Sequence, residues 1–234
     1  GVEATRVEPA LPDIEEWSNH ERLAREKKML GFFVSGHPLD RYRDELTSFV
    51  TSPIGDLRQA VDGREVTVGG ILTAIKPMTD KKGNQMAFAT LEDFSGHVEL
   101  ILFSDCFEKA KEILEVDRIV LTRGRISTRE GERPKVLSSE VLAMEKITER
   151  FNCQLVIKLN PQCAEDTIEQ ALATLDQYRG SVPVLLATRE NGSEVYIKSR
   201  RYAVNLDFQL LNHLKALLGD SAAYLRPVGL KNGF

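Results

Sequence analysis

The spacing of apolar side chains divides the chain into a helical part and parts that alternate every second residue. Over residues 18–50, apolar side chains recur three or four positions apart, as on one face of a helix. Ser18 and Glu21 fit a capping box at the start of a first helix. Pro38 suits the first position of a second helix, because proline lacks the N–H that a helix start leaves unpaired. The pattern therefore predicts a helical hairpin within a segment over residues 17–60.

Residues 64–147 change to an alternation of apolar and polar positions, which is typical of strands. The expected elements are strands over residues 65–74, 85–92, 98–103, 118–128 and 135–144, and a short helix over residues 107–114. Three strands, a helix and two strands are the element order of an OB-fold, a five-stranded Greek-key barrel. We therefore predict an OB-fold nucleic-acid-binding domain over residues 64–147, with the helix plugging one end of the barrel.

Residues 151–228 mix both kinds of spacing. We expect strands over residues 155–159, 182–188, 195–198 and 224–228, and helices over residues 166–178 and 208–218. Asn191-Gly192 suits a hairpin turn, because both residues tolerate a positive φ. The order β-α-β-β-α-β predicts a small α+β domain. The predicted fold class is thus multidomain, β and α+β, and residues 1–16, with two prolines and little periodicity, are expected to form a flexible lead-in.

Composition narrows the class of protein. The formal net charge is -4 at pH 7, so any contact with nucleic acid must come from a local patch. Cys106, Cys153 and Cys163 are unclustered and form no C-x-x-C pair, which argues against a disulfide scaffold or a zinc knuckle. No apolar run approaches the roughly 18 residues that span a bilayer, and the first residues do not resemble a signal peptide. A cytoplasmic setting is the simplest expectation.

Two turns of the predicted barrel carry the candidate binding residues. OB-folds bind ligands on strands two and three and on the loops that join strands one to two and four to five. In both loop regions here, Lys and Arg outnumber Asp and Glu. Cations that follow a nucleic-acid backbone and aromatic rings that stack on bases hold single strands. The candidate nucleic-acid-binding residues are Lys76, Lys81, Lys82, Asn84, Phe88, Phe103, Arg123, Arg125, Arg129, Arg133 and Lys135.

Simpler interpretations of these residues stay open. Basic turns are often only solvated, and alternation does not settle whether Phe88 and Phe103 stack on bases or fill the barrel. Four carboxylates on or near adjacent strands are of the type that holds Mg²⁺, although such residues more often lie on solvated faces. They are Glu92, Asp93, Glu99 and Asp105.

His37 is a weaker candidate for catalysis, since it more simply lies at the cap of the second helix. The chain has no phosphate-binding G-x-x-x-x-G-K-[ST] loop, no G-x-S-x-G and no H-E-x-x-H. We therefore predict no catalytic residue and no metal site in this stretch.

Three segments carry a resemblance to a known family. Within residues 26–42, the predicted first helix is followed by Leu-Gly-Phe-Phe-Val-Ser-Gly-His-Pro. This segment resembles one in the bacterial DNA polymerase III alpha subunit. In that family, a helix with this ending precedes the OB domain. The predicted barrel is similar as well, in Val68-Gly-Gly-Ile71, in the basic turn 79–84 and in residues 90–103. Residues 210–219 resemble the last helix of the subunit, so the resemblance covers about residues 15–228.

The resemblance implies a non-catalytic C-terminal region of a DNA-directed DNA polymerase, a nucleotidyltransferase of DNA replication. The barrel would bind single-stranded DNA template. Residues 151–228 would dock on the tau subunit of the clamp loader, next to other subunits of the holoenzyme. The carboxylates that bind Mg²⁺ belong to the palm domain of that family, and no cofactor is expected in this stretch.

Other expectations follow from the motifs that are missing or shared. Residues 1–16 lack the family's Gln-x-x-Met/Leu-Phe type of clamp-binding peptide, so contact with the sliding clamp is not expected. An interaction scaffold whose barrel no longer binds nucleic acid is the alternative function. A metal-dependent nuclease or nucleotidyltransferase and the anticodon-binding barrel of a tRNA synthetase are weaker alternatives.

Overall fold

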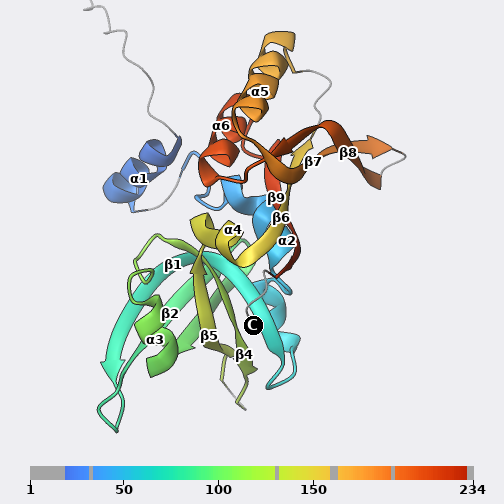
Figure 1. Cartoon of the computed structure of the whole chain (residues 1–234). Helices are drawn as coiled ribbons and strands as arrows, with labels where there is room; N and C mark the ends of the chain where they lie inside the picture. The colour runs from blue at the N-terminus through green and yellow to red at the C-terminus, as the bar shows by residue number, and fades with distance from the viewer. Residues whose placement is uncertain (1–18, 32–33, 130–131, 159–162, 191–192, 231–234) are drawn as a thin grey trace, which may run out of the picture. The chain divides into compact units, whose positions relative to one another are not determined.

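The computed structural model describes residues 19–31, 34–129, 132–158, 163–190 and 193–230 (Figure 1). The chain divides into two compact units, one ending at Pro38 and the other beginning at Leu39. The first unit contains α1 (Asn19–Leu30), where the Glu26 carboxylate accepts hydrogen bonds from the N–H groups of Val34 and Ser35 at 2.7 and 2.9 Å. The predicted lead-in over residues 1–16 and the capping residue Ser18 lie outside the described residues.

Five strands of the second unit close into a barrel. They are β1 (Glu65–Thr79), β2 (Gln85–Asp93), β3 (Gly96–Leu102), β4 (Ile119–Ser127) and β5 (Lys135–Ala143), in the order β1-β2-β3-β5-β4. Strands β3 and β5 are parallel, and all other neighbours are antiparallel. Helix α3 (Ser104–Ala110) connects β3 to β4. The predicted OB-fold is confirmed.

Alternation along the strands fills the barrel. On β2, the inward residues Ala87, Ala89 and Leu91 are buried, and Phe107 of α3 belongs to the same hydrophobic cluster. Small residues let neighbouring strands approach closely. A Cβ on Gly124 of β4 would lie 2.3 Å from the Leu137 carbonyl oxygen of β5, so only glycine fits there.

The bounds of several elements differ from those predicted. Strand β1 continues to Thr79 rather than ending at residue 74. Strand β4 pairs with β1 only as far as Ile71, so the rest of β1 pairs with β2 alone and has one free edge. Pro77 lacks a backbone N–H, and at a free edge this loses no hydrogen bond between strands. Helix α3 begins at Ser104 rather than at residue 107, because Phe103 leaves the strand and becomes its N-cap.

The second predicted helix begins later than expected. A 3₁₀ turn (Asp40–Tyr42) precedes α2 (Arg43–Phe49), whereas Pro38 lies in the turn before them. A further 3₁₀ segment, η2 (Ile54–Gln59), leads into the barrel.

The C-terminal part is a four-stranded sheet with two helices. Its strands are β6 (Phe151–Lys158), β7 (Arg179–Glu190), β8 (Ser193–Val204) and β9 (Ala223–Leu230), in the order β8-β7-β6-β9. Helices α5 (Glu165–Gln177) and α6 (Phe208–Leu218) complete the predicted β-α-β-β-α-β order. The register aligns Leu225, Leu155 and Val184 across one face of the sheet. These residues are buried together with Leu175 of α5 and Leu214 of α6.

Strands β7 and β8 are longer than predicted. They run over 12 residues each, whereas the apolar alternation covered only residues 182–188 and 195–198. β8 lies at an edge of the sheet, and most of its side chains are exposed, so apolar alternation does not mark its full length. The Asn191-Gly192 turn lies outside the described residues.

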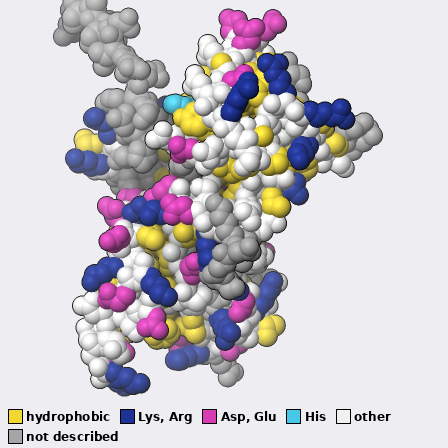
Figure 2. Space-filling model, viewed as in Figure 1, with side chains coloured by type: hydrophobic (Ala, Val, Ile, Leu, Met, Phe, Trp, Pro, Cys, Tyr) yellow, Lys and Arg dark blue, Asp and Glu magenta, His cyan; other side chains and the backbone are white. Residues whose placement is uncertain are grey.

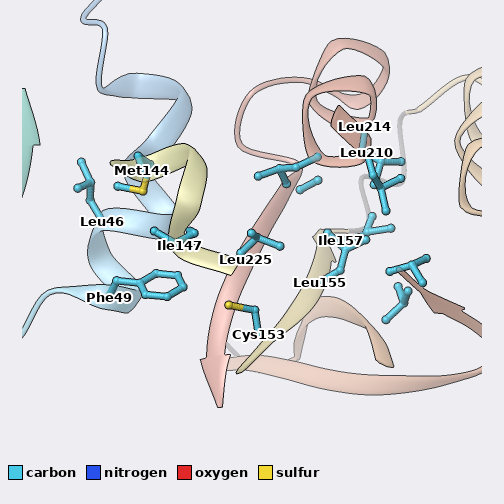
Figure 3. Close-up of a cluster of buried hydrophobic side chains, with 14 of the residues drawn as sticks. Leu46, Phe49, Met144, Ile147, Cys153, Leu155, Ile157, Leu210, Leu214 and Leu225 are labelled. Carbon is cyan, nitrogen blue, oxygen red and sulfur yellow. The ribbon is translucent and has the colours of Figure 1, made fainter. Parts of the chain in front are cut away.

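One hydrophobic cluster joins the barrel to the C-terminal sheet within the second unit. Leu46 and Phe49 of α2 are buried with Met144 and Ile147, which follow β5, and with Leu225 of β9 (Figure 3). The rings of Phe49 and Phe151 contact edge to face, with centroids 5.1 Å apart. The predicted boundaries of the barrel at 64–147 and of the last domain at 151–228 stay a prediction. Within the described ranges, no helix is long and apolar enough to cross a bilayer.

Candidate nucleic-acid interface

The register of the barrel aligns a row of side chains across its outer face. Lys76 of β1 pairs with Phe88 of β2, and Phe88 pairs with Ile101 of β3. Ile101 lies beside Leu137 of β5, which in turn pairs with Arg125 of β4. Phe88, Ile101 and Leu137 are only half-buried. The row is thus a partly exposed apolar strip with one cation at each end.

Both candidate aromatic residues lie outside the barrel core. Phe88 is half-buried between the inward-facing Ala87 and Ala89. Phe103, at the N-cap of α3, is 53% exposed. The two rings are therefore placed to contact a ligand.

Two methionines extend this apolar surface towards the β1–β2 turn. Met78 is 42% exposed and pairs with the half-buried Met86, which is two residues before Phe88 on the same face of β2. Sequence analysis missed Met78, Met86 and Ile101. Met86 lies two residues before Phe88, and Ile101 lies two residues before Phe103. Because alternate residues of a strand share a face, this spacing could have identified Met86 and Ile101.

The β1–β2 turn is organised by Asp80. Its Oδ1 atom accepts hydrogen bonds from the N–H groups of Lys82 and Asn84, both at 2.8 Å, and the Asn84 amide donates to Oδ2 at 3.0 Å. The hydrogen bond from the Asn84 side-chain amide is the main cause that lowers the pKa of Asp80, and the backbone N–H bonds lower it further. The Asn84 side chain therefore stabilises the turn. The exposed side chains of Lys76, Lys81 and Lys82 have no ion-pair partner among the described residues.

Two arginines of β4 share one carboxylate. Arg123 Nη2 lies 3.1 Å from Glu65 Oε2, and Arg125 Nη2 lies 3.6 Å from Glu65 Oε1. The hydrogen bond from Arg123 is the main cause that lowers the pKa of Glu65. Much of the charge of these two cations is therefore already balanced across the β1–β4 pair.

Lys135 is also paired. Its Nζ lies 3.1 Å from Glu99 Oε1 and 3.7 Å from Glu132 Oε2. The close approach of the Glu99 carboxylate is the main cause that raises the pKa of Lys135. On the face of the barrel seen in Figure 2, cationic and acidic side chains are interspersed and do not form one block of positive charge.

The β4–β5 turn keeps two cations that face solvent. Arg129 is exposed and has no ion pair within the described part of the chain. Arg133 is exposed too, and its Nη1 lies 2.9 Å from Nε2 of His97 on β3. The β1–β2 and β4–β5 turns both lie at the lower end of the barrel in Figure 1.

The acidic candidates are not gathered into one site. Asp93 accepts hydrogen bonds from the N–H groups of Ile54 and Ser95 at 2.9 and 2.7 Å, and Glu99 pairs with Lys135. Among the described residues, no group of three or more His, Cys, Asp or Glu side chains is placed to hold a metal ion.

This chain is similar to known proteins in two ways, over the barrel alone and over nearly the whole sequence. The family of OB-fold nucleic acid binding domains matches residues 66–146. The likeness to the solved mitochondrial single-stranded DNA binding protein Rim1 of S. cerevisiae is weak, with a TM-score of 0.31 and 10% identity over 36% of this chain and 97% of that one. At that level it carries nothing about function.

DNA polymerase III subunit alpha is the name that recurs among the relatives. The chain is 27% identical to that of Escherichia coli (strain K12) over 228 residues, which is 95% of this chain and 20% of the relative. The Vibrio cholerae protein is 30% identical over 94% of this chain and 19% of its own length. For Pseudomonas fluorescens the identity is 35% over 71% of this chain and 14% of the relative.

The chain thus spans about a fifth of the length of the first two relatives. Their coverage of this chain extends beyond the barrel into both flanking parts, as the Gly-His-Pro segment and the last helix predicted. The resemblance is confirmed: over nearly its whole length, the chain is similar to part of the bacterial DNA polymerase III alpha subunit.

Proposed function

We propose that the barrel binds single-stranded DNA across the outer face of β1, β2 and β3, as a non-catalytic part of a replicative polymerase subunit. The observation that carries this proposal is the apolar strip of Phe88, Ile101 and Leu137, which continues to the exposed ring of Phe103. The rings of Phe88 and Phe103 offer flat surfaces for unpaired bases, whose stacking on aromatic rings needs no particular sequence. Ile101 and Leu137 add apolar surface beside Phe88.

Lysines at the edge of the strip supply the complementary charge. Lys76 ends the row that contains Phe88, and Lys81 and Lys82 project from the turn that follows. Phosphates that these ammonium groups neutralise release counterions, so the affinity falls as salt rises. Because Arg123, Arg125 and Lys135 already have acidic partners, we expect moderate affinity rather than tight binding.

Fluorescence anisotropy of a labelled oligo-dT at several salt concentrations tests the proposal. Saturable binding is expected, with a log–log salt slope of roughly −0.7 for each phosphate contacted. The variant Lys76→Ala/Lys81→Ala/Lys82→Ala should bind more weakly and with a shallower slope. Lys198→Ala/Arg200→Ala/Arg201→Ala removes the same charge from exposed positions of β8 and serves as the control. Equal loss in both variants, or no binding by the wild type at low salt, would overturn the proposal and favour an interaction scaffold.

We also propose that the C-terminal sheet docks on the tau subunit of the clamp loader, as the resemblance implies. In support, this part of the chain exposes large apolar side chains: Ile168, Ile197 and Val228 are 42%, 51% and 63% exposed. Exposed apolar side chains of this kind suit a protein interface.

Capture of the whole chain by immobilised tau tests the docking. The whole chain is needed, because α2 and the barrel share a hydrophobic cluster with the sheet. Ile197→Asp and Val228→Asp should weaken capture, whereas Val116→Asp, at a 47% exposed position before β4, should not. Capture that survives both sheet variants and is lost with Val116→Asp would move the contact away from the sheet.

A further inference from the structure

A second group of basic side chains lines a cavity against the barrel. The cavity, of about 270 Å³, lies between η2, the β2–β3 turn and the residues that precede β5. Arg58, His97 and Arg133 line it from these three separate elements. We propose that this cavity binds a phosphate group, and that the group is a backbone phosphodiester of the single strand. The second half of this proposal rests on the proposed function.

Among the described residues, the side chains that line the cavity carry no negative charge, although the Asp93 carboxylate is hydrogen-bonded to the backbone of its walls. Its described lining includes two arginines and a histidine, and neither an Asp nor a Glu. Arg58 and Arg133 are exposed, and neither forms an ion pair within the described ranges. Glu92 lies opposite His97 in the β2–β3 register but does not line the cavity. The site therefore has two guanidinium groups without an ion-pair partner among the described residues.

Hydrogen bonds fix the walls of the cavity. Asp93 bridges η2 and the turn, because it accepts from the N–H groups of Ile54, Ser95 and Gly96 at 2.9, 2.7 and 3.0 Å. The Gly55 N–H donates to Ser95 Oγ at 2.8 Å. The carboxylate of Asp93 is occupied by these donors. The walls are thus held in place before any ligand arrives.

The chemistry of the lining suits a phosphate better than a base. A guanidinium group offers a planar fork of donors that matches two phosphate oxygens at once. Arg133 Nη1 already lies 2.9 Å from His97 Nε2, so two of the three basic groups converge on one place. Among the described residues, the imidazole of His97 is the only aromatic ring in the lining, so they offer a base no extended stacking surface there.

The cavity and the proposed interface both include residues of β3. His97 lies on the outer face of β3, four residues before Ile101 of the apolar strip, at the same parity along the strand. Strand geometry places these two residues about 13 Å apart. A single strand whose bases lie on the strip can therefore pass its backbone over the cavity.

NMR of the ¹⁵N-labelled whole chain tests the site directly. The dinucleotide d(TpT) carries one phosphodiester, and its titration should move the amide signals of Gly55, Ser95 and Gly96 in a saturable manner. Arg58→Ala and Arg133→Ala should each weaken this response by about tenfold, as expected for one lost charge-assisted contact. Arg200→Ala, at an exposed position of β8, is the matched control and should leave the response unchanged.

Separate arms distinguish the source of the phosphate. If inorganic phosphate moves these signals and d(TpT) does not, the cavity takes a free phosphate and the assignment to the strand is wrong. If neither moves them, the whole inference is overturned.

Binding of oligo-dT separates this inference from the proposed function. An oligonucleotide that binds in a Phe88-dependent manner without moving the cavity signals would leave the interface standing and remove the cavity from it. If d(TpT) moves the cavity signals but the chain does not bind oligo-dT, the cavity binds a phosphodiester and the proposed interface is wrong. If both hold, Arg133→Ala should lower the magnitude of the salt slope for oligo-dT by about 0.7.

Discussion

The Nζ atom of Lys215 on α6 lies 2.7 Å from Oε1 of Glu45 on α2, and both side chains are 1% exposed. The two residues are 170 positions apart in the chain. Lys215 also donates a hydrogen bond to the carbonyl oxygen of Arg41. Because burial disfavours both charged forms, it raises the pKa of Glu45 and lowers the pKa of Lys215, against the attraction between them. This ion pair ties the segment before the barrel to the C-terminal sheet.

Removing one partner of this pair should cost more than removing both. Glu45→Leu or Lys215→Met alone leaves an unpaired buried charge, which is expected to lower the free energy of unfolding by about 3–5 kcal/mol. The double variant should lie close to the wild type, since apolar side chains replace both charges. Urea denaturation followed by circular dichroism measures the difference. Asp40→Asn breaks the exposed Arg43–Asp40 pair and should change stability by less than about 1 kcal/mol.

The same pair predicts a pH dependence. The folded chain holds the Glu45 proton more tightly than the unfolded chain, so the contribution of Glu45 to stability falls as pH rises above 4.5. The unfolded chain holds the Lys215 proton more tightly, so the contribution of Lys215 rises as pH approaches 10.5. The stability of the wild type relative to the double variant should therefore be lowest between these values. A difference that is constant from pH 4 to pH 10 would show that the two groups are not desolvated.

The Glu65 carboxylate pairs with Arg123 and Arg125 of β4, so removing its charge should strengthen the binding of single-stranded DNA. Glu65→Gln removes the carboxylate that Arg123 and Arg125 share, and frees their charge for phosphates. The affinity for oligo-dT at low salt should rise, and the salt slope should steepen by about 0.7 for each new contact. Glu169→Gln, at an exposed position of α5, makes the same change in net charge and is the control. Equal gains in both variants would mean that only net charge matters.

The two surface phenylalanines should act without changing the salt dependence. Phe88→Ala and Phe103→Ala each remove a stacking surface worth about 1–3 kcal/mol per base, which is about a 5- to 150-fold loss of affinity. Because neither substitution removes a cation, the slope of affinity against salt should be unchanged. Anisotropy at three salt concentrations separates the two effects. Ile168→Ala, at an exposed apolar position of α5, should have no effect on oligo-dT binding.

The pattern of residues 85–92 shows what a sequence decides and what it does not. It predicted β2 correctly, because alternation is a local property of a strand. It did not decide which face is buried, because Met86 and Phe88 are at least as apolar as Ala87 and Ala89. The barrel decides this, since its narrow interior accepts the alanines and leaves the larger side chains outside.

Charge balance was harder to predict than the fold. The local count around Arg123 included the nearby acids of the β4–β5 turn, but the carboxylate that pairs with it is Glu65, 58 residues away. Lys135 meets Glu99 only because β3 and β5 are parallel neighbours. Arg58 and His97 were missed for the same reason, since they meet only when η2 folds against the β2–β3 turn. Pairings across a barrel depend on register, which a window along the chain does not contain.

The cysteines should differ in reactivity according to their burial. Cys106 is buried on α3 against the barrel, and desolvation raises the pKa of its thiol to about 11. Cys153 is buried as well, whereas Cys163 is half-buried. A thiol reagent at pH 8 should therefore modify Cys163 first and the other two only after denaturation, since the thiolate is the reactive form. Mass spectrometry of the labelled peptides, with Cys163→Ser as the control, measures the order. Rapid labelling of Cys106 in the native chain would show that α3 leaves the end of the barrel in solution.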